Sequence, residues 1–383
     1  MLVPKLYAYT FLGEFILLYP VYTLLFTDTG LSVAETSSLF AIWSVTGMIL
    51  EVPSGAWADA VSRRLLLCLG PLLAGAGYAL WILFPSYWAF AAGFVLWGAQ
   101  GALVSGAFEA LSYEELERLG QESRYATVMG RAESIGLVAD AAAIGLAMPV
   151  FAAGGYLAVG AASVLACVLC AATALTLPEH RASATATDGS YLSVLRAGIT
   201  EARTDRGVLH ALLLVSFVTA IWGALEEYVP FLGLETGVAK TTIPLLVLVV
   251  WIGAASGGLL AGAARRMPGR AYALTIGGAA LAMAAGAMSG HPAGFALIAV
   301  AFGAFQLAGI VADARLQERI TGTARATVTS VAGLGTNLVT LAVYTAYAAA
   351  SPGLSHGATF ALLVVPYLFI ALMAARPSPS PVQ

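Results

Sequence analysis

The stretch GAWADAVSRR, Gly55–Arg64, is a short connection between two long apolar runs. The run before it is Leu39–Trp57 and the run after it is Leu65–Phe84. Each is close to the ~20 residues that a helix needs to cross the hydrocarbon core of a bilayer. Because the connection carries one acid and two arginines, these charges are expected at a membrane surface. The stretch therefore predicts a chain that crosses a membrane at least twice.

The composition extends this prediction to the whole chain. Hydrophobic residues make up 60% of it and charged residues 10%, whereas about a quarter of an ordinary globular domain is charged. The apolar runs are continuous rather than alternating, which favours helices over the strands of a membrane barrel. This composition excludes a soluble domain. The net charge of −3, without a basic tract, gives no sign of a nucleic-acid partner.

Apolar windows of sufficient length can be placed about 12 times along the chain. The expected spans are 5–27, 35–57, 65–84, 87–112, 125–149, 155–177, 208–232, 242–264, 271–289, 292–315, 325–349 and 355–375. Lysine and arginine between these spans fall almost entirely on one side, and Lys240 is the exception. Since cytoplasmic loops retain positive charge, both termini are expected in the cytoplasm.

The longest connection divides the spans into six and six. We therefore expect an N-terminal bundle over 1–177, a cytoplasmic linker over 178–207 and a C-terminal bundle over 208–383. The linker contains YLSVLRAGITEARTDRG, whose leucines share one face, and this predicts an interfacial amphipathic helix. The two halves echo one another, because Asp28-Thr29-Gly30 after the first span recurs as Glu235-Thr236-Gly237 after the seventh.

The opening stretch resembles the loop signature of the major facilitator superfamily, G-x-x-x-D-R/K-x-G-R/K-R/K. Four of its positions are matched, by Gly55, Asp59, Arg63 and Arg64. The basic residue after the acid is replaced by Ala60 and the second glycine by Ser62. The stretch lies between the second and third spans, which is where the family has it, and the resemblance covers the whole chain.

The resemblance implies an all-α membrane protein of about 12 transmembrane helices in two pseudo-symmetric six-helix bundles, with the substrate site between them near mid-membrane. It also implies a conformational latch at Gly55, Asp59, Arg63 and Arg64. In this latch Asp59 caps a helix of the opposite half and interacts with its dipole. The alanine at position 60 is expected to weaken the latch.

Acids inside spans are candidates for function, because a charge at the membrane centre costs about 2.5–3.5 kcal/mol on insertion scales. Glu14 lies deep in the first span. Tyr7, Phe11 and Leu18 are expected to share a helix face with it. Such a group could bind a cationic or amphipathic substrate, or carry the coupling proton. The structural alternative is a neutral glutamate hydrogen-bonded to a neighbouring span.

The fifth span carries two more acids, Glu133 and Asp140, seven residues apart and so on roughly one face. They could share protons, or one of them could pair with Arg131. Arg131 and Glu109 lie at matching depths in the fifth and fourth spans, which predicts a structural ion pair between them. That pair is more consistent with a latch than with transport.

On the seventh span, Trp222 and Glu226 lie one turn apart and could form the outer wall of a cavity. An interfacial aromatic residue is the equally open alternative for Trp222.

Two further family patterns are partial. The fourth-span pattern R-x-x-Q-G keeps Gln100 but lacks the arginine, and the fifth-span antiporter pattern keeps Gly136 and Gly145. Because the arginine is missing, we expect proton coupling to depend on Glu14, Glu133 and Asp140. The partial antiporter pattern favours export.

The combined prediction is a proton-coupled secondary transporter that exports a small cationic or neutral organic molecule. It is expected to act as a monomer in a bacterial cytoplasmic membrane, with protons and the lipid bilayer as its other partners. A proton-coupled importer and a passive uniporter remain open alternatives. An enzyme is not expected, because no nucleophile or metal cluster converges. No cofactor or metal is predicted, and an ATP-binding loop is excluded because the only lysines are Lys5 and Lys240.

Overall fold

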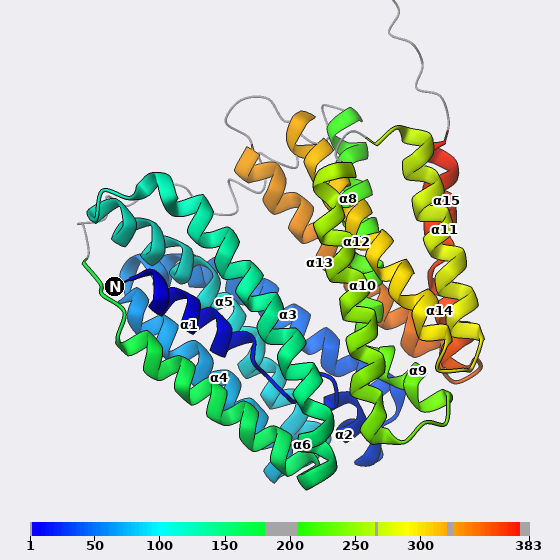
Figure 1. The fold of residues 1–383 in the computed structure, drawn as a ribbon, viewed down its shortest axis with the longest axis horizontal. Coiled ribbons are helices and arrows are strands. Elements are labelled where there is room, and N and C mark those ends of the chain that lie inside the picture. The colour runs from blue at the N-terminus through cyan, green and yellow to red at the C-terminus, as the bar shows by residue number, and fades with distance from the viewer. Residues whose placement is uncertain (1, 181–205, 265–266, 320–324, 376–383) are drawn as a thin grey trace, which may run out of the picture. The chain divides into compact units, whose positions relative to one another are not determined.

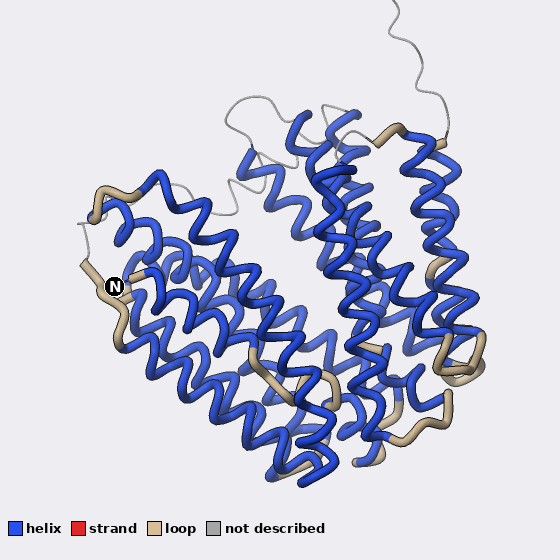
Figure 2. The backbone as a smooth tube through the Cα atoms, viewed as in Figure 1, coloured by secondary structure: helices blue, strands red, loops and turns tan. Residues whose placement is uncertain are grey.

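The computed structural model describes residues 2–180, 206–264, 267–319 and 325–375, and within these ranges it contains helices and connecting loops but no strand (Figures 1 and 2). Two compact units divide the chain. Unit 1 comprises Met1–Asp188 together with Lys240–Leu245, and unit 2 comprises Gly189–Ala239 and Leu246–Gln383. Each unit is a helical bundle with its own buried core.

Within its described residues, the main part of unit 1 contains six α-helices and one short 3₁₀ helix. In chain order they are α1 (Val3–Glu14), α2 (Tyr22–Asp28), α3 (Val33–Ala60), α4 (Arg63–Leu83), α5 (Tyr87–Arg118), the 3₁₀ helix η1 (Glu122–Arg124) and α6 (Tyr125–Leu175). The helix α6 is kinked at Gly154 and Gly155, whose backbone angles are not helical. Gly155 has a φ of 59°, a conformation that favours glycine. The kink separates the predicted fifth and sixth spans.

Unit 2 repeats this order of elements. It contains α8 (Arg206–Glu226), α9 (Val229–Glu235), α10 (Ile243–Ala264), α11 (Gly269–Met288), α12 (Gly294–Arg319), α13 (Arg325–Ala350), α14 (His356–Leu363) and α15 (Val365–Ala374). The short η2 (Lys240–Thr242) and the first residues of α10 cluster with unit 1.

Ten helices are long and apolar enough to cross a membrane among the residues that the structure describes. One of them, Glu122–Leu175, includes the kink and accounts for two predicted spans. The first predicted span is absent from the ten because it is divided between α1 and α2. The prediction of an all-α membrane protein with about 12 spans in two bundles is confirmed.

Close helix packing in both units depends on facing glycines. A Cβ atom added at Gly77 of α4 would lie 2.9 Å from the carbonyl oxygen of Gly93 in α5. The corresponding helices of unit 2, α11 and α12, approach in the same way at Gly286, where a Cβ would lie 2.6 Å from the carbonyl oxygen of Gly294. Small residues allow such backbone approach in membrane helices. The repeated contact supports the predicted pseudo-symmetry of the halves.

The signature stretch differs from the prediction in its secondary structure. We expected a loop from Gly55 onward, but α3 continues as a helix to Ala60, and only Val61 and Ser62 separate it from α4. A single-turn connection suffices because Ser62 caps α4, its hydroxyl accepting a hydrogen bond from the Leu65 N–H at 3.1 Å.

Two predictions fall outside what the structure describes. The side chains of residues 52–60 are not described, so the roles expected for Gly55 and Asp59 in the latch stay predictions. The amphipathic helix expected within 178–207 also lies largely outside the described residues, and so does the exact boundary of the linker.

Both units interrupt their first helix at an acidic residue. In unit 1, α1 ends at Glu14 and the chain becomes helical again only at Tyr22. In unit 2, α8 ends at Glu226 and α9 begins at Val229. Interrupted spans at matching positions of two repeats are the feature that most directly indicates a binding site in secondary transporters. The interruption in unit 1 borders the cavity described next.

Candidate functional site

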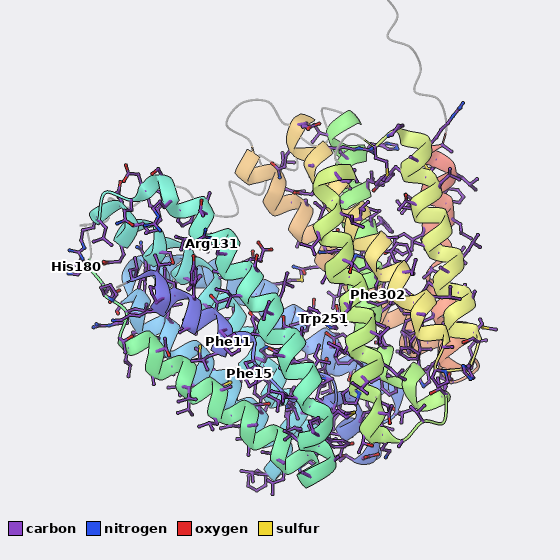
Figure 3. The ribbon with its side chains drawn as sticks, in the orientation of Figure 1. Phe11, Phe15, Arg131, His180, Trp251 and Phe302 are labelled. Carbon is purple, nitrogen blue, oxygen red and sulfur yellow. The ribbon has the colours of Figure 1, made fainter. Side chains whose placement is uncertain are left out.

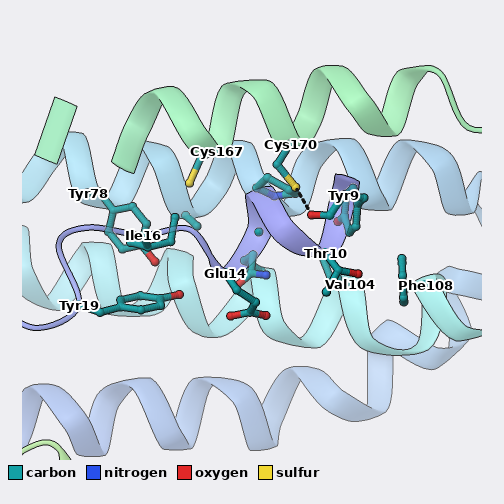
Figure 4. A pocket seen from close by; sticks show the side chains of 14 residues that line it. Tyr9, Thr10, Glu14, Ile16, Tyr19, Tyr78, Val104, Phe108, Cys167 and Cys170 are labelled. Carbon is teal, nitrogen blue, oxygen red and sulfur yellow. Dashed lines mark hydrogen bonds between the residues drawn. The ribbon is translucent and has the colours of Figure 1, made fainter. Parts of the chain in front are cut away.

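A cavity of about 140 Å³ lies inside unit 1, beside the interruption after α1 (Figure 4). Its walls come from α1, the chain after α1, α4, α5 and the second half of α6. The residues that line it are Tyr9, Thr10, Gly13, Glu14, Ile16, Tyr19, Pro71, Ala74, Tyr78, Gln100, Val104, Phe108, Cys167 and Cys170. The lining is therefore mainly apolar and aromatic, with one acid.

Glu14 is the last residue of α1, and the chain turns sharply just after it. Phe15 has φ −80° and ψ 63°, the angles of an inverse γ-turn, and the Ile16 N–H donates to the Glu14 carbonyl oxygen at 2.8 Å. The Glu14 side chain lines the cavity and remains accessible to water. Among the described residues, no side chain or backbone group forms a hydrogen bond or ion pair with its carboxylate.

The position of Glu14 is set by close packing between α1 and α6. A Cβ atom added at Gly136 would lie 3.4 Å from the Glu14 Cγ and 3.4 Å from the Thr10 Cγ2. The absence of a side chain at Gly136 therefore leaves room for these two residues. Gly136, which belongs to the predicted fifth-span pattern, is therefore in direct contact with residues of the site.

The chain after α1 is fixed by a buried hydroxyl. The Leu18 N–H donates to the Ser163 Oγ at 3.0 Å, and the Ser163 hydroxyl donates in turn to the Val159 carbonyl oxygen at 2.8 Å. Both Leu18 and Ser163 are fully buried. This satisfies a backbone group that the interruption of the helix would otherwise leave without a partner.

Aromatic rings surround the carboxylate. Tyr9 stacks on Phe108 with a centroid distance of 5.5 Å, and Tyr19 meets Tyr78 edge-on at 6.5 Å. In Figure 4 the Tyr19 hydroxyl points toward the Glu14 carboxylate. Tyr19 is also stacked on Trp97, at 5.2 Å and an interplanar angle of 18°.

Several polar hydrogens in the cavity are already used within the protein. The Tyr9 hydroxyl donates to the Leu67 carbonyl oxygen at 3.0 Å, and the Thr10 hydroxyl donates to the Leu6 carbonyl oxygen at 3.2 Å. The Cys170 thiol donates to the Tyr9 carbonyl oxygen at 3.4 Å (Figure 4). The Tyr19 and Tyr78 hydroxyls and the Gln100 amide also line the cavity.

The structure changes the set of residues around Glu14. Tyr7 and Phe11 were expected to share its face, but neither lines the cavity. Tyr7 packs against the core of unit 1, and Phe11 stacks on Phe15 at 5.4 Å (Figure 3). Leu18 is fully buried. The prediction of a shared face was wrong for Leu18 because the helix ends at Glu14, so the i+4 relation does not hold beyond it.

Sequence reasoning missed Tyr19, Tyr78 and Phe108 as lining residues. Tyr78 and Phe108 come from other spans, and no pattern within one span could identify them. Tyr19 follows from the interruption, and a signal for that interruption was present, because Gly13 lies just before it and Pro20 lies within it.

The two acids of the fifth span have different environments. Glu133 is exposed, whereas the Asp140 side chain is buried with 8% of its surface accessible. A spacing of seven residues places the two acids on roughly the same side of α6. The part of that side that carries Asp140 is buried within unit 1, whereas the part that carries Glu133 is exposed. Neither lines the cavity. Their roles in proton coupling stay predictions.

The expected Glu109–Arg131 pair is not formed. No ion pair joins these residues among those that the structure describes, and both side chains are exposed (Figure 3 labels Arg131). The two residues have matching depths, but α5 and α6 make little contact outside their connection, since α6 packs mainly on α1 and α4. Matching depth alone therefore did not bring the charges together.

A different charge cluster lies at the N-terminal end of α4. Arg63, which is buried, forms an ion pair with Glu114. Glu179 accepts hydrogen bonds from the Ser62 hydroxyl at 2.5 Å and from the backbone N–H groups of Arg63 at 2.6 Å and Arg64 at 3.4 Å. A carboxylate at this position compensates the helix dipole. The arginines of the signature stretch thus have acidic partners within unit 1.

In unit 2, Glu226 and Trp222 lie at the matching interruption. The Trp251 side chain lies near the Glu226 carboxylate. The Trp222 ring meets Phe302 edge-on at 5.5 Å, and its indole nitrogen is buried without a hydrogen-bond partner among the described residues. Figure 3 shows Trp251 on α10 and Phe302 on α12.

No group of three or more histidine, cysteine or acidic side chains in the described ranges could hold a metal ion. Cys68, Cys167 and Cys170 are free and buried. Cys167 and Cys170 line the cavity with small apolar surfaces, which is the usual role of buried cysteine.

The interrupted spans, the two helical bundles and the cavity beside the first interruption are features of a multi-pass membrane protein of the transporter class. A family model described as the Major Facilitator Superfamily matches residues 6–344, nearly the whole chain. The protein therefore belongs to the major facilitator superfamily, as the signature stretch indicated. No curated protein matches the chain in sequence.

Solved structures with the same fold include three transporters. A mutant of the nucleoside transporter NupG matches with a TM-score of 0.81 and 12% identity over 98% of this chain and 100% of that one. The D-xylose-proton symporter matches at 0.70 and 15% over 98% and 97%. A bacterial homologue of the human lysosomal transporter Spinster matches at 0.70 and 15% over 97% and 94%. At these identities the likeness is one of fold.

Proposed function

We propose that this protein is a proton-coupled secondary transporter of a small organic molecule, and that Glu14 binds the coupling proton. The observation that carries the proposal is the environment of Glu14. It is a carboxylate at an interruption of a spanning segment, it lines a cavity, and no hydrogen-bond or ion-pair partner among the described residues compensates it.

Burial in an apolar wall disfavours the charged form of a carboxylate, whereas contact with water or with a cation favours it. A site that alternates between these environments takes up and releases a proton. The usual fourth-span arginine is absent, because Trp97-Gly98-Ala99-Gln100-Gly101 has no basic residue. Gln100 nevertheless lines the same cavity as Glu14. Coupling through Glu14 is therefore consistent with the missing arginine.

The cargo is a cationic or neutral molecule. The residues that line the cavity include one acid and no lysine, arginine or histidine. An anionic cargo would face a carboxylate and aromatic ring faces, which repel negative charge. The protein acts as a transporter rather than an enzyme, with protons and the cargo as its partners, and works as a monomer.

Export is the direction that the sequence favours. Gly136 and Gly145 keep the spacing of the antiporter pattern, and Gly136 packs directly on Glu14. Import is the second candidate, because one protein of the same fold is a D-xylose-proton symporter. In either case we place the protein in a bacterial cytoplasmic membrane with both termini in the cytoplasm, as the distribution of arginine suggests.

The test is cargo-triggered proton movement in everted membrane vesicles. Cationic, neutral and anionic compounds are added to vesicles holding a pH gradient, with wild type compared with Glu14→Gln. Glu117→Gln, at an exposed position near the end of α5, is the matched control. We expect one class of compound to dissipate the gradient in wild type and in the control but not in Glu14→Gln. A Glu14→Gln response equal to wild type would remove Glu14 from the coupling path.

A further inference from the structure

We infer that the cavity beside Glu14 receives an alkylated ammonium head group, so that the cargo is an organic cation rather than a polyhydroxylated or anionic molecule. This inference rests on the proposed transport function and assigns its substrate class. It follows from the charge, ring geometry, hydrogen bonding and size of the cavity, which are taken in turn.

The charge of the cavity is unbalanced. Glu14 contributes a carboxylate, and none of the other lining residues is basic. The carboxylate has no hydrogen-bond or ion-pair partner among the described residues. A cation that enters the cavity would supply the missing charge.

Four aromatic rings line the same space, those of Tyr9, Tyr19, Tyr78 and Phe108. The face of an aromatic ring attracts a cation, and alkylated ammonium groups are bound in this way within aromatic cages. Tyr19 is held in place by stacking on Trp97. The Tyr19 ring, whose hydroxyl points toward the carboxylate in Figure 4, therefore has a fixed orientation before any cargo binds.

A second stack fixes Trp97 itself. Trp97 packs on Trp43 of α3 with a centroid distance of 4.8 Å and an interplanar angle of 23°. The three rings of Tyr19, Trp97 and Trp43 form a continuous stack from the cavity to α3. A preorganised wall of this kind lowers the entropy cost of binding.

The hydrogen-bonding capacity of the cavity suits a cationic head group that itself has no N–H or O–H group. The hydroxyls of Tyr9 and Thr10 and the thiol of Cys170 already donate to backbone carbonyl oxygens. A sugar or nucleoside would bring several hydroxyls against only the Glu14 carboxylate, the Gln100 amide and two tyrosine hydroxyls, and each buried group left unsatisfied costs about 1–3 kcal/mol. An alkylated ammonium has no such groups to satisfy.

The volume limits how much of the cargo is enclosed. Sites that enclose a whole drug-sized ligand occupy roughly 300–1,000 Å³, and this cavity has about 140 Å³. It therefore accommodates a compact head group, and the rest of the cargo extends outside it.

The experiment measures binding separately from transport. The full chain is purified in detergent, and its thermal unfolding midpoint is followed with increasing choline. Two references are the uncharged choline isostere, in which carbon replaces the nitrogen, and sodium chloride at equal ionic strength. A ligand that binds only the folded protein raises the midpoint with concentration. We expect choline to raise it, and the isostere and sodium chloride not to.

Four variants assign the effect to the cavity. Choline affinity should fall about tenfold or more in Glu14→Gln and in Tyr19→Leu, whereas Tyr19→Phe, which keeps the ring, should bind choline as wild type does. Tyr113→Leu removes an exposed tyrosine of α5 that does not line the cavity, and should also bind choline normally. Comparing Phe and Leu at position 19 separates loss of the ring from loss of folding.

Stabilisation by the isostere equal to that by choline, unchanged choline affinity in Glu14→Gln, or no stabilisation by choline would each overturn the inference. These outcomes are distinct from failure of the proposed function. Proton-coupled transport of a neutral compound that depends on Glu14 would sustain the function and contradict the head-group assignment. Choline binding without proton movement for any cation would do the reverse.

Discussion

Substitution of Gly136 tests whether the packing of α6 on α1 sets the position of Glu14. An ideal Cβ at position 136 lies 3.4 Å from carbon atoms of both Glu14 and Thr10, and the optimal separation of carbon atoms is about 3.5–4.0 Å. Alanine therefore requires a shift of only a few tenths of an ångström. That cost is offset by the better helix propensity of alanine, up to about 1 kcal/mol. Gly136→Ala should leave stability and transport close to wild type.

Gly136→Val adds two methyl groups, each about 1.5 Å beyond the Cβ. The two methyl groups occupy two of the three staggered positions, so at least one of them points toward α1. Overpacking of this kind costs about 1–3 kcal/mol, and it displaces Glu14 without removing any charge. We expect cargo-triggered proton movement to fall about tenfold or more in this variant.

The assay is the vesicle assay described above, with the amount of protein in the membrane measured for each variant. Gly130→Val is the matched control, because Gly130 lies on the same helix and a Cβ there meets nothing within 4 Å. It should behave as wild type. If Gly136→Val moves protons as well as wild type does, the packing of α6 does not position Glu14 and the reasoning is refuted.

Three further predictions concern the stability of the framework, measured as thermal unfolding of the purified protein. Ser163→Ala leaves the buried Leu18 N–H without its acceptor and should lower stability by about 1–3 kcal/mol; an unchanged midpoint would mean that another group accepts this bond. Glu235→Gln weakens the cap that Glu235 provides to the first backbone N–H groups of α14, and a loss of about 0.5–1 kcal/mol is expected, reduced at high salt. Gly257→Ala places a Cβ against the carbonyl of Gly303, so it should cost about 1–3 kcal/mol, and wild-type stability would show that α10 and α12 can separate freely.

The number and order of the spans could be predicted because a bilayer imposes one length and one backbone requirement on every span. The echo between Asp28-Thr29-Gly30 and Glu235-Thr236-Gly237 also has a structural counterpart. Asp28 and Glu235 end the second segments of the two interrupted spans. Asp28 accepts a hydrogen bond from the Tyr156 hydroxyl at 2.7 Å, and Glu235 accepts one from the His356 N–H at 2.6 Å. Each acid anchors the start of a later span of its unit.

The neighbours of Glu14 were harder to predict. Helical periodicity assumes an unbroken helix, and this assumption fails after Glu14, where an inverse γ-turn redirects the chain. Glu14 itself could be found because one acid in an apolar run is costly whatever its partners. Tyr78 and Phe108 could not, since the spans that face α1 depend on packing that no single span encodes.

The charged pairs show a second limit. Glu109 and Arg131 lie at similar depths on consecutive spans, yet no ion pair joins them among the residues described. Arg63 instead pairs with Glu114. Depth follows from the position of a residue along its span, but the direction of a side chain depends on the rotation and tilt of the helix. Rotation and tilt are set by packing, for example at the facing glycines of α4 and α5.

The most direct test of the central claim is the infrared spectrum of the purified protein, recorded for wild type and Glu14→Gln as the pH is varied. The difference between the two isolates the C=O band of a protonated Glu14 carboxyl. If Glu14 carries the coupling proton of an exporter, this band is present without cargo and disappears when the compound that drives proton movement in vesicles is added. Identical spectra for wild type and Glu14→Gln at every pH would contradict the claim, and a band that the compound leaves unchanged would contradict exchange of the cargo for the proton.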